Sequence, residues 1–386
     1  MKKLLIVTTI PDTLTGFLLP FAKHFRNLGW QVDGMACEAS TDTKCVENFD
    51  RLWDVEWSRN PLDLRNLLIT PSTIRKIVSQ EKYDIVHVHT PVAAFVTRYA
   101  LRNLRKSLGT KVIYTAHGFH FYPGGKRLKN TVFIALEKLA GAWTDKLVVI
   151  NAEDQKAAIR YNLLSPLDIH YMPGIGVDLN YYSPEKVQEA DIQRVRQELK
   201  LESDTSLLLS VAELNPGKRH RDIIKAIAHL NRPDLCMAFA GEGPLLEDLT
   251  RLANQMGVQD QIRFLGFRPD ISTWIRASVA TVLASEREGL PRSIMESMSL
   301  GTPVIGTNIR GVNDLLAHNS GIIFPVGDSE KLACALASVI DDPQMAQKIA
   351  KKGQDRVLKY DLHHIIKLHE SLYTEALSSN PKQINE

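Results

Sequence analysis

Residues 283–311 read LASEREGLPRSIMESMSLGTPVIGTNIRG and contain a strand, a turn and a helix in immediate succession. The apolar run at residues 280–284 predicts the strand. Apolar residues at helical spacing predict a helix from about 292 to 300, and Gly301 is the kind of residue that commonly ends one. Residues 304–306 then begin another strand. This succession is typical of a doubly wound parallel sheet, so we expect an α/β protein.

Two glutamates occupy special places in this stretch. Glu288 sits at the carboxyl end of a strand, and Glu296 lies about one turn inside the helix that follows. Ligands of open parallel sheets bind at that edge of the strands. Two carboxylates so placed can accept hydrogen bonds from hydroxyls at two points of one extended polyol. On spacing alone, a solvated loop glutamate and a surface helix glutamate explain the pattern equally well.

The flanking residues carry a resemblance to a known family. Glu288-Gly-Leu-Pro, continued to Glu296 and Gly301-Thr-Pro-Val-Ile, resembles the E-x7-E signature of family-4 glycosyltransferases, which are retaining enzymes of the GT-B fold. The resemblance implies that Glu288 holds hydroxyls of the donor sugar and Glu296 those of the ribose. The residues between them belong to the same expected donor site: Gly289, Leu290 and Pro291.

The resemblance also implies an architecture. We expect two Rossmann-like domains facing across a cleft, with the acceptor on the first, the donor nucleotide on the second, and a C-terminal helix crossing back to the first. The expected boundaries are residues 1–175, 176–360 and 361–386. A chain of 386 residues is about right for two domains.

Charge is unevenly distributed along the chain. The net charge is +3, but residues 1–175 carry 23 basic against 16 acidic side chains and residues 176–386 carry 24 against 28, so the halves are +7 and −4. We expect the basic half to face something anionic. Four scattered cysteines are typical of a reducing compartment. No apolar run reaches the ~20 residues of a membrane span, so we expect a cytoplasmic protein, possibly attached to the inner face of the membrane.

The first half begins with a strand at residues 4–8, a turn at 13–17 and a helix at 17–28. Gly16, at the start of that helix, would let a diphosphate approach backbone amides, although a glycine in such a turn more often only shapes it. The family carries two adjacent glycines here, and this chain has one.

Histidines and aromatic residues mark the expected acceptor side. His87 and His89 point the same way along one strand; a buried polar pair explains them better than a zinc site. The strand at 111–115 delivers His117, whose equivalent in the family lies against the donor sugar and the reacting hydroxyl. Phe119, Phe121 and Tyr122 could form a platform for a sugar ring or for lipid. The other acceptor-side candidates are His120, Tyr122 and Asn151, the last at the tip of the strand after residue 145.

Two basic clusters lie in the first half. The segment from Val96 to Leu108 reads as one amphipathic helix, and the second cluster is Lys126–Lys129. A solvated face explains them, and contact with anionic lipid headgroups is the functional alternative. The basic residues of the first cluster are Arg98, Arg102, Arg105 and Lys106.

The second half offers candidates for the donor diphosphate and base. Lys218 precedes a helix and would neutralise the diphosphate. The family usually has an arginine where Glu213 stands, and Arg219 partly replaces that cation. The remaining donor-side candidates follow the next two strands: Gly241 and Gly243, whose backbone would approach the nucleotide, and Phe267 and Arg268, whose backbone would edge the base.

We therefore expect a retaining hexosyltransferase with His117, Lys218 and Glu288 as its catalytic residues. No D-x-D motif occurs, so we expect no metal and no other cofactor. The expected partners are a nucleotide sugar, most simply a uridine one, a saccharide acceptor on a lipid diphosphate and an anionic membrane surface, with no nucleic acid. A sugar-nucleotide epimerase of the same fold and a non-catalytic nucleotide-sugar-binding protein are the alternatives.

Overall fold

The computed structural model describes residues 1–57, 63 and 65–378. The chain forms two compact units. Unit 1 contains residues 1–175 together with the segment from 364 onward, and unit 2 contains residues 176–363. Of the segment predicted to form the C-terminal helix, residues 379–386 lie outside the described part of the chain.

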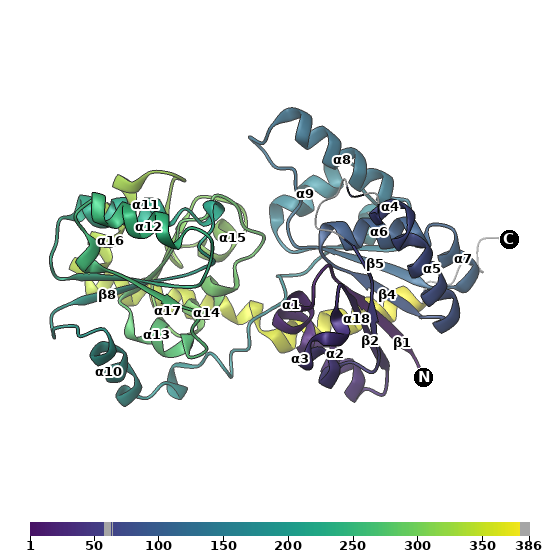
Figure 1. The fold of residues 1–386 in the computed structure, drawn as a ribbon, viewed down its shortest axis with the longest axis horizontal. Coiled ribbons are helices and arrows are strands. Elements are labelled where there is room, and N and C mark those ends of the chain that lie inside the picture. The colour runs from purple at the N-terminus through teal and green to yellow at the C-terminus, as the bar shows by residue number, and fades with distance from the viewer. Residues whose placement is uncertain (58–62, 64, 379–386) are drawn as a thin grey trace. The chain divides into compact units, whose positions relative to one another are not determined.

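Unit 1 is built on a seven-stranded sheet in the order β3-β2-β1-β4-β5-β6-β7, and every strand pair is parallel (Figure 1). The central strands β1 and β4 are mostly apolar and, apart from Lys3, buried, as expected where helices cover both faces of a parallel sheet. The strands are β1 (Lys3–Val7), β2 (Gln31–Ala36), β3 (Leu52–Asp54), β4 (Ile85–Val88), β5 (Lys111–Ala116), β6 (Lys146–Val149) and β7 (Ile169–Tyr171).

The helices of unit 1 follow the strands in the alternation that the sequence predicted. They are α1 (Pro11–Thr13), α2 (Leu19–Asn27), α3 (Thr43–Asn48), α4 (Arg65–Leu68), α5 (Thr70–Glu81), α6 (Pro91–Leu101), α7 (Leu104–Leu108), α8 (Arg127–Gly141) and α9 (Ala152–Arg160). The long last helix, α18 (Leu362–Ser378), belongs to unit 1 from His364 onward and packs its buried face there. Short 3-10 turns occur at Ala39–Thr41 and Pro166–Asp168.

Two sequence predictions for unit 1 were wrong in detail. The segment after β1 is not a turn: helical structure begins at Pro11, and Gly16 lies inside a π-helical turn (Leu14–Leu18), not at a helix start. The backbone amides of a helix interior bond within the helix, so the predicted reason for Gly16 to bind phosphate fails. The basic segment 96–108 is two helices, because α6 ends at Leu101 and α7 begins at Leu104.

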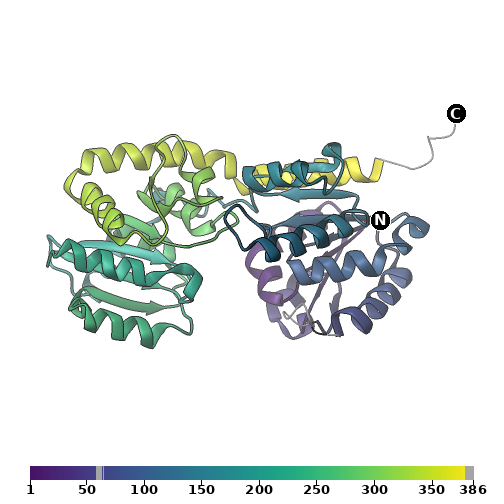
Figure 2. The same ribbon diagram turned by 90° about the horizontal axis from the view of Figure 1, so that it is seen from above.

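Unit 2 contains a six-stranded parallel sheet in the order β10-β9-β8-β11-β12-β13. Its strands are β8 (Ser206–Val211), β9 (Leu235–Ala240), β10 (Ile262–Gly266), β11 (Ala280–Leu283), β12 (Val304–Thr307) and β13 (Ile322–Phe324). The predicted strand–turn–helix–strand of the fold-deciding stretch is confirmed as β11, α14 and β12. Figure 2 shows helices on either side of this sheet. The doubly wound α/β prediction therefore holds in both units.

The helices of unit 2 cover the sheet and enclose two apolar cores. They are α10 (Glu189–Glu198), α11 (His220–Leu230), α12 (Leu246–Gln255), α13 (Ile271–Ala277), α14 (Arg292–Ser299), α15 (Val312–Leu316), α16 (Ser329–Asp341) and α17 (Pro343–Val357). Short 3-10 turns occur at Pro184–Lys186, Pro216–Lys218, Gln259–Gln261 and Leu358–Tyr360. Among the described residues, no helix combines the length and the apolar character needed to cross a bilayer.

Candidate functional site

The strand order of unit 2 reverses between β8 and β11. The chain leaves β8 toward β9 and β10 on one side, and resumes at β11 toward β12 and β13 on the other. The loops that leave the carboxyl ends of β8 and β11 therefore run in opposite directions along the sheet, and open α/β sheets bind ligands between two such loops. The backbone amide of Glu286 donates to the carbonyl of Gly217 at 2.9 Å, and this bond holds the two loops side by side.

An ion pair spans this reversal point. Lys218 Nζ, from the loop after β8, lies 2.5 Å from Glu288 Oε1, from the loop after β11. Both side chains are largely covered, at 26% and 12% exposure. Asn215 caps the 3-10 turn Pro216–Lys218. Its side-chain oxygen accepts a hydrogen bond from the backbone amide of Lys218 at 3.2 Å. The structure thus brings together two of the three predicted catalytic residues, one of each charge.

Glu296 is buried in the first turns of α14, whereas the alternative of a surface helix glutamate would leave it exposed. Its side chain is 9% exposed and pairs with Arg292 at 2.9 Å. Burial raises the pKa of Glu296 above its ordinary value, while Arg292 and a hydrogen bond with Tyr182 oppose that rise. A buried, partly compensated carboxylate is a strong acceptor for a hydroxyl ligand, and the surface-helix alternative for Glu296 is excluded.

Glycines allow backbone to approach backbone at this edge. Gly241 and Gly243 follow β9 with φ of +150° and +156°, and a Cβ on Gly241 would lie 2.1 Å from the carbonyl oxygen of Ala212. A Cβ on Gly311 would lie equally close, at 2.1 Å, to the carbonyl of Gly289. These positions exclude side chains because the loops that bear the candidate donor residues are packed directly against them. The neighbouring Leu290 and Pro291 lead into α14.

The other predicted donor residues already have partners within unit 2. Glu213 accepts a hydrogen bond from the side-chain amide of Asn215 at 2.9 Å. Arg219 pairs with Asp222 at 2.5 Å. To replace the family's cation at the diphosphate, as predicted, Arg219 would have to bind the diphosphate and Asp222 at the same time. Arg268 is held by Glu198 and Asp270, whereas the adjoining Phe267 is 74% exposed.

The sheet of unit 1 reverses between β1 and β4, and the predicted acceptor histidines gather at the carboxyl ends of its strands. Thr9 and Thr90 bridge the reversal point through their hydroxyls at 2.8 Å. His89 Nδ1 lies 3.1 Å from His117 Nε2, which follows β5. The predicted buried pair is confirmed, because His87 and His89 are 1% and 3% exposed.

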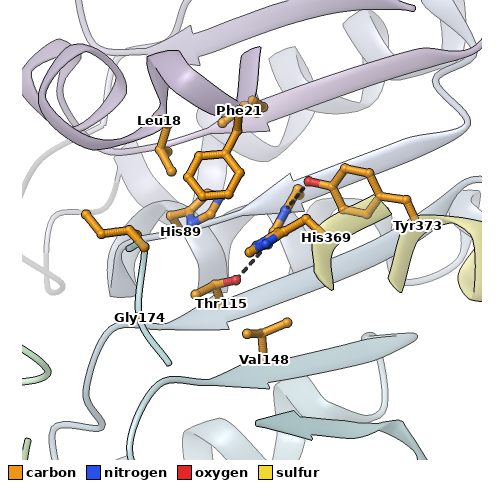
Figure 3. A pocket seen from close by; sticks show the side chains of 11 residues that line it. Leu18, Phe21, His89, Thr115, Val148, Gly174, His369 and Tyr373 are labelled. Carbon is orange, nitrogen blue, oxygen red and sulfur yellow. Dashed lines mark hydrogen bonds between the residues drawn. The ribbon is translucent and has the colours of Figure 1, made fainter. Parts of the chain in front are cut away.

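A fourth histidine, His369, lies with His87 and His89 around a small cavity, which Figure 3 shows. His369 of α18 meets the ring of Phe21 edge-on, at 4.7 Å between ring centroids, and lies near His87. His87 bonds the hydroxyls of Tyr373 and Thr115 at 2.6 and 2.7 Å. Burial, reinforced by His369, lowers the pKa of His117 to about 4, so its imidazole is neutral at neutral pH.

The predicted aromatic platform was wrong. Phe119 and Phe121 are 1% and 4% exposed and stack on each other in the core of unit 1. Their alternation with His120 and Tyr122 turns one set inward and the other outward. Tyr122 is 39% exposed and His120 packs against the ring of Phe133.

Asn151 has a structural task that the sequence did not reveal. It caps α9, accepting from the backbone amide of Asp154 at 2.8 Å and donating to the same residue's carboxylate. Its side chain is fully buried, so its predicted contact with an acceptor has no support from the geometry. An asparagine just before a helix with acidic residues in the first turn is a recognisable cap signal.

The predicted basic face of residues 96–108 holds only in part: Lys106 is exposed and Arg102 half-buried, but Arg98 and Arg105 are not free surface cations. Arg98 is 1% exposed, pairs with Glu137 at 3.0 Å and lies over the ring of Tyr114. Arg105 pairs with Asp145 at 2.6 Å with only 11% of its side chain exposed. The amphipathic spacing misled because an arginine can lie on the inner face of a helix when a carboxylate meets it there. In the second cluster, Lys126 and Lys129 are exposed.

Sequence reasoning missed several residues because their partners are distant in the chain. His369 and Tyr373 reach the histidines from α18, and Tyr182 bonds Glu296. His220 is buried, and within the described structure neither ring nitrogen has a hydrogen-bond partner. The described residues contain no group of three or more His, Cys, Asp or Glu side chains arranged to hold a metal ion.

Comparison with known proteins identifies the family of the chain. The model of "Glycosyltransferase Family 4" matches residues 17–181, and that of "Glycosyl transferases group 1" matches residues 191–356. EpsD of Bacillus subtilis (strain 168), whose glycosyltransferase description is provisional, is 32% identical over 99% of both chains. The chain belongs to this glycosyltransferase family. A galactosyltransferase of Escherichia coli named for UDP-Gal and α-D-GlcNAc-diphosphoundecaprenol is 29% identical over 72% of this chain and 71% of its own.

Solved structures assign the fold. Anabaena Alr3699/HepE, crystallised with UDP, superposes with a TM-score of 0.81 at 20% identity, over 97% of this chain and 100% of that one. WaaG, a glycosyltransferase involved in lipopolysaccharide biosynthesis, superposes with a TM-score of 0.74 at 15% identity, over 96% and 99%. This glycosyltransferase therefore has the GT-B fold.

Proposed function

We propose that this glycosyltransferase moves a hexose or N-acetylhexosamine from a UDP-sugar to a saccharide carried on a lipid diphosphate, with retention of anomeric configuration and without a metal. The acceptor would be presented at an anionic membrane surface, in the synthesis of a cell-surface polysaccharide. The observation that carries the proposal is the Lys218–Glu288 ion pair at the strand reversal of unit 2.

Each member of that pair suits one part of a nucleotide sugar. The ammonium of Lys218, beside the 3-10 turn before α11, would neutralise the charge that develops on the leaving diphosphate, the electrostatic contribution that usually dominates such transfers. The carboxylate of Glu288 would accept hydrogen bonds from hydroxyls of the donor sugar. Binding of the donor would then exchange the Lys218–Glu288 ion pair for one contact with the diphosphate and one with the donor sugar.

Glu296 and His117 would complete the site. Glu296, buried and held by Arg292, would accept from the two ribose hydroxyls of the nucleotide. His117 is a neutral imidazole at the carboxyl end of β5, and it would contact the reacting hydroxyl of the acceptor. The choice of uridine is supported by relatives: one is named for UDP-Gal, and HepE was crystallised with UDP. The choice of a lipid diphosphate acceptor is supported by the first of these names.

A donor-release screen tests the proposal. The protein is incubated with a panel of UDP-, GDP-, ADP- and dTDP-sugars, with and without a saccharide on a short polyprenyl diphosphate. We expect acceptor-dependent release of UDP from one UDP-sugar and a product one sugar longer. Release of nucleotide only from a non-uridine donor would contradict the proposed UDP-sugar donor. Equal transfer to saccharides without a lipid diphosphate would contradict the proposed acceptor.

A further inference from the structure

Helix α8 (Arg127–Gly141) has an apolar stripe on the side that faces away from its own unit. Leu128, Val132, Leu136 and Leu139 are 80%, 49%, 38% and 52% exposed. Their spacings of four, four and three residues place them within roughly 80° of one another around a helix of ~3.6 residues per turn. They form one continuous outward ridge, which we call the α8 ridge.

The opposite side of the same helix faces the core of unit 1. Phe133 and Ile134 pack against that core, and Glu137 turns inward to Arg98 and Tyr114. Gly141 approaches the backbone so closely that a Cβ there would lie 2.0 Å from the carbonyl of Leu163. Since the inner side alone anchors the helix, folding of unit 1 does not explain a second apolar side. In Figure 1, α8 forms part of the outline of unit 1.

Positive charge borders the ridge. At ~100° per residue, Lys129 lies on one side of the ridge and Arg127 with Lys138 on the other. Lys126 precedes the first turn of the helix. No acidic residue occurs between His117 and Leu136, and the one acidic residue of the helix, Glu137, is bonded inward. The outward side of α8 is thus apolar in the middle and cationic at both edges.

We propose that α8 lies in the interface of an anionic lipid bilayer, with the α8 ridge among the acyl chains and the four cations at the phosphate level. Helices that bind membranes in this way combine an apolar stripe with flanking lysine and arginine. Each flanking cation adds attraction to an anionic surface. The inference rests on the proposed function for its purpose: the segment that follows His117 and leads into α8 would lie close to a lipid-borne acceptor.

A second copy of the chain is the weaker occupant. In an isologous dimer through the ridge, each cationic edge would meet an equivalent cationic edge of the other copy. A single narrow ridge is also small beside the ~800 Å² that each partner contributes to a stable interface. An anionic surface instead complements the apolar and charged parts of α8 at once.

Vesicle sedimentation with matched variants tests the inference. The apolar variant is Leu128→Gln with Leu139→Gln, and its control is Leu167→Gln with Leu358→Gln, which changes two leucines of similar exposure (85% and 62%) elsewhere. The charge variant is Arg127→Glu with Lys129→Glu. Its control is Lys225→Glu with Lys348→Glu, which changes one exposed lysine on α11 and one on α17. Circular dichroism first establishes that all four variants are folded.

We expect the wild type and both controls to bind vesicles of phosphatidylglycerol with phosphatidylcholine, and to bind pure phosphatidylcholine weakly. Both α8 variants should lose at least about tenfold in vesicle partitioning. If the α8 variants bind like their controls, the inference is overturned. It is also overturned if analytical ultracentrifugation finds a wild-type dimer that the apolar variant dissociates while vesicle binding is absent throughout.

Activity separates this inference from the proposed function. Transfer to a short-chain acceptor in detergent should be the same in the wild type and both α8 variants, because the ridge would contact only the bilayer. Vesicle binding with no transfer to any acceptor would refute the proposed function and leave the membrane contact standing. Transfer in detergent without vesicle binding would do the reverse.

Discussion

Lys218 Nζ and Glu288 Oε1 lie 2.5 Å apart although 70 residues separate them in the sequence. The pair joins the two loops that diverge at the strand reversal of unit 2. A ligand that carries both a diphosphate and a hydroxylated sugar would compete for both charges at once. Free nucleotide lacks the sugar and would need only the cation. The two halves of the pair are therefore expected to respond differently to substitution.

Glu288→Gln should spare the binding of free UDP and weaken the binding of the UDP-sugar. The change keeps the shape of the side chain but removes charge-assisted acceptance, worth about 1.5–3 kcal/mol for a hydrogen bond to a charged group. Calorimetric titration with UDP and with the UDP-sugar measures the difference. Glu247→Gln, on the exposed side of α12, is the control and should change neither affinity. Equal losses for both ligands would remove Glu288 from the sugar subsite.

Glu296→Gln should lower the affinity for UDP itself by about tenfold or more, because the ribose hydroxyls would lose a charged acceptor. Tyr182→Phe removes a hydrogen bond that holds the Glu296 carboxylate and should cause a smaller loss. Titration with UDP and with uracil-free ribose diphosphate measures both. Glu247→Gln on the exposed side of α12 is the control. An affinity for UDP unchanged in Glu296→Gln would leave this residue a structural role only.

Binding of the donor should need no divalent cation. The chain contains no D-x-D motif, and a lysine stands at the expected place of the diphosphate. Titration of the UDP-sugar in excess chelator should reproduce the affinity measured with magnesium or manganese. A strict requirement for either ion would contradict the proposed role of Lys218.

Stability of unit 1 should fall in acid as the buried histidines charge. Burial lowers the pKa of His369 to about 4, against about 6.5 in the unfolded chain. Its contribution is fully present above pH 6.5 and is lost as the pH falls toward 4, where the unfolded state takes up protons first. A shift of this size corresponds to on the order of 3 kcal/mol. The histidines His87, His89 and His117 face it, and no carboxylate lines the cavity.

Urea unfolding at several pH values measures this dependence. His369→Gln should flatten the loss of unfolding free energy between pH 6.5 and 4, whereas His364→Gln, exposed on the same helix, should leave it unchanged. The same slope in both variants would show that folding does not lower the pKa of His369.

The sequence determined the fold where local pattern and tertiary position agree. The strand–helix–strand around Glu288 was predictable because buried parallel strands are short apolar runs and a glycine ends the helix. The segment after β1 was not, because Gly16 signals a turn locally while the structure continues a helix through it. Propensity is a weak guide when tertiary packing holds a segment.

The candidate site was predictable residue by residue but not as a set of contacts. Spacing placed Lys218, Glu288 and His117 at strand ends, where ligands bind. It could not reveal that Lys218 meets Glu288, or that α18 supplies His369 and Tyr373, because those partners lie 70 to 286 residues away. Amphipathic spacing was misleading at Arg98, whose charge is met inside by Glu137. Only the fold decides which side of such a helix is solvated.

The anomeric configuration of the product tests the central claim most directly. The protein is incubated in chelator with the active α-linked UDP-sugar and the lipid diphosphate acceptor, and the new glycosidic linkage is examined by proton NMR. Retaining, metal-free transfer predicts an α-linked product, formed by the wild type and by Glu247→Gln but strongly reduced in Lys218→Met. A β-linked product, or no product until a divalent cation is added, would contradict the account.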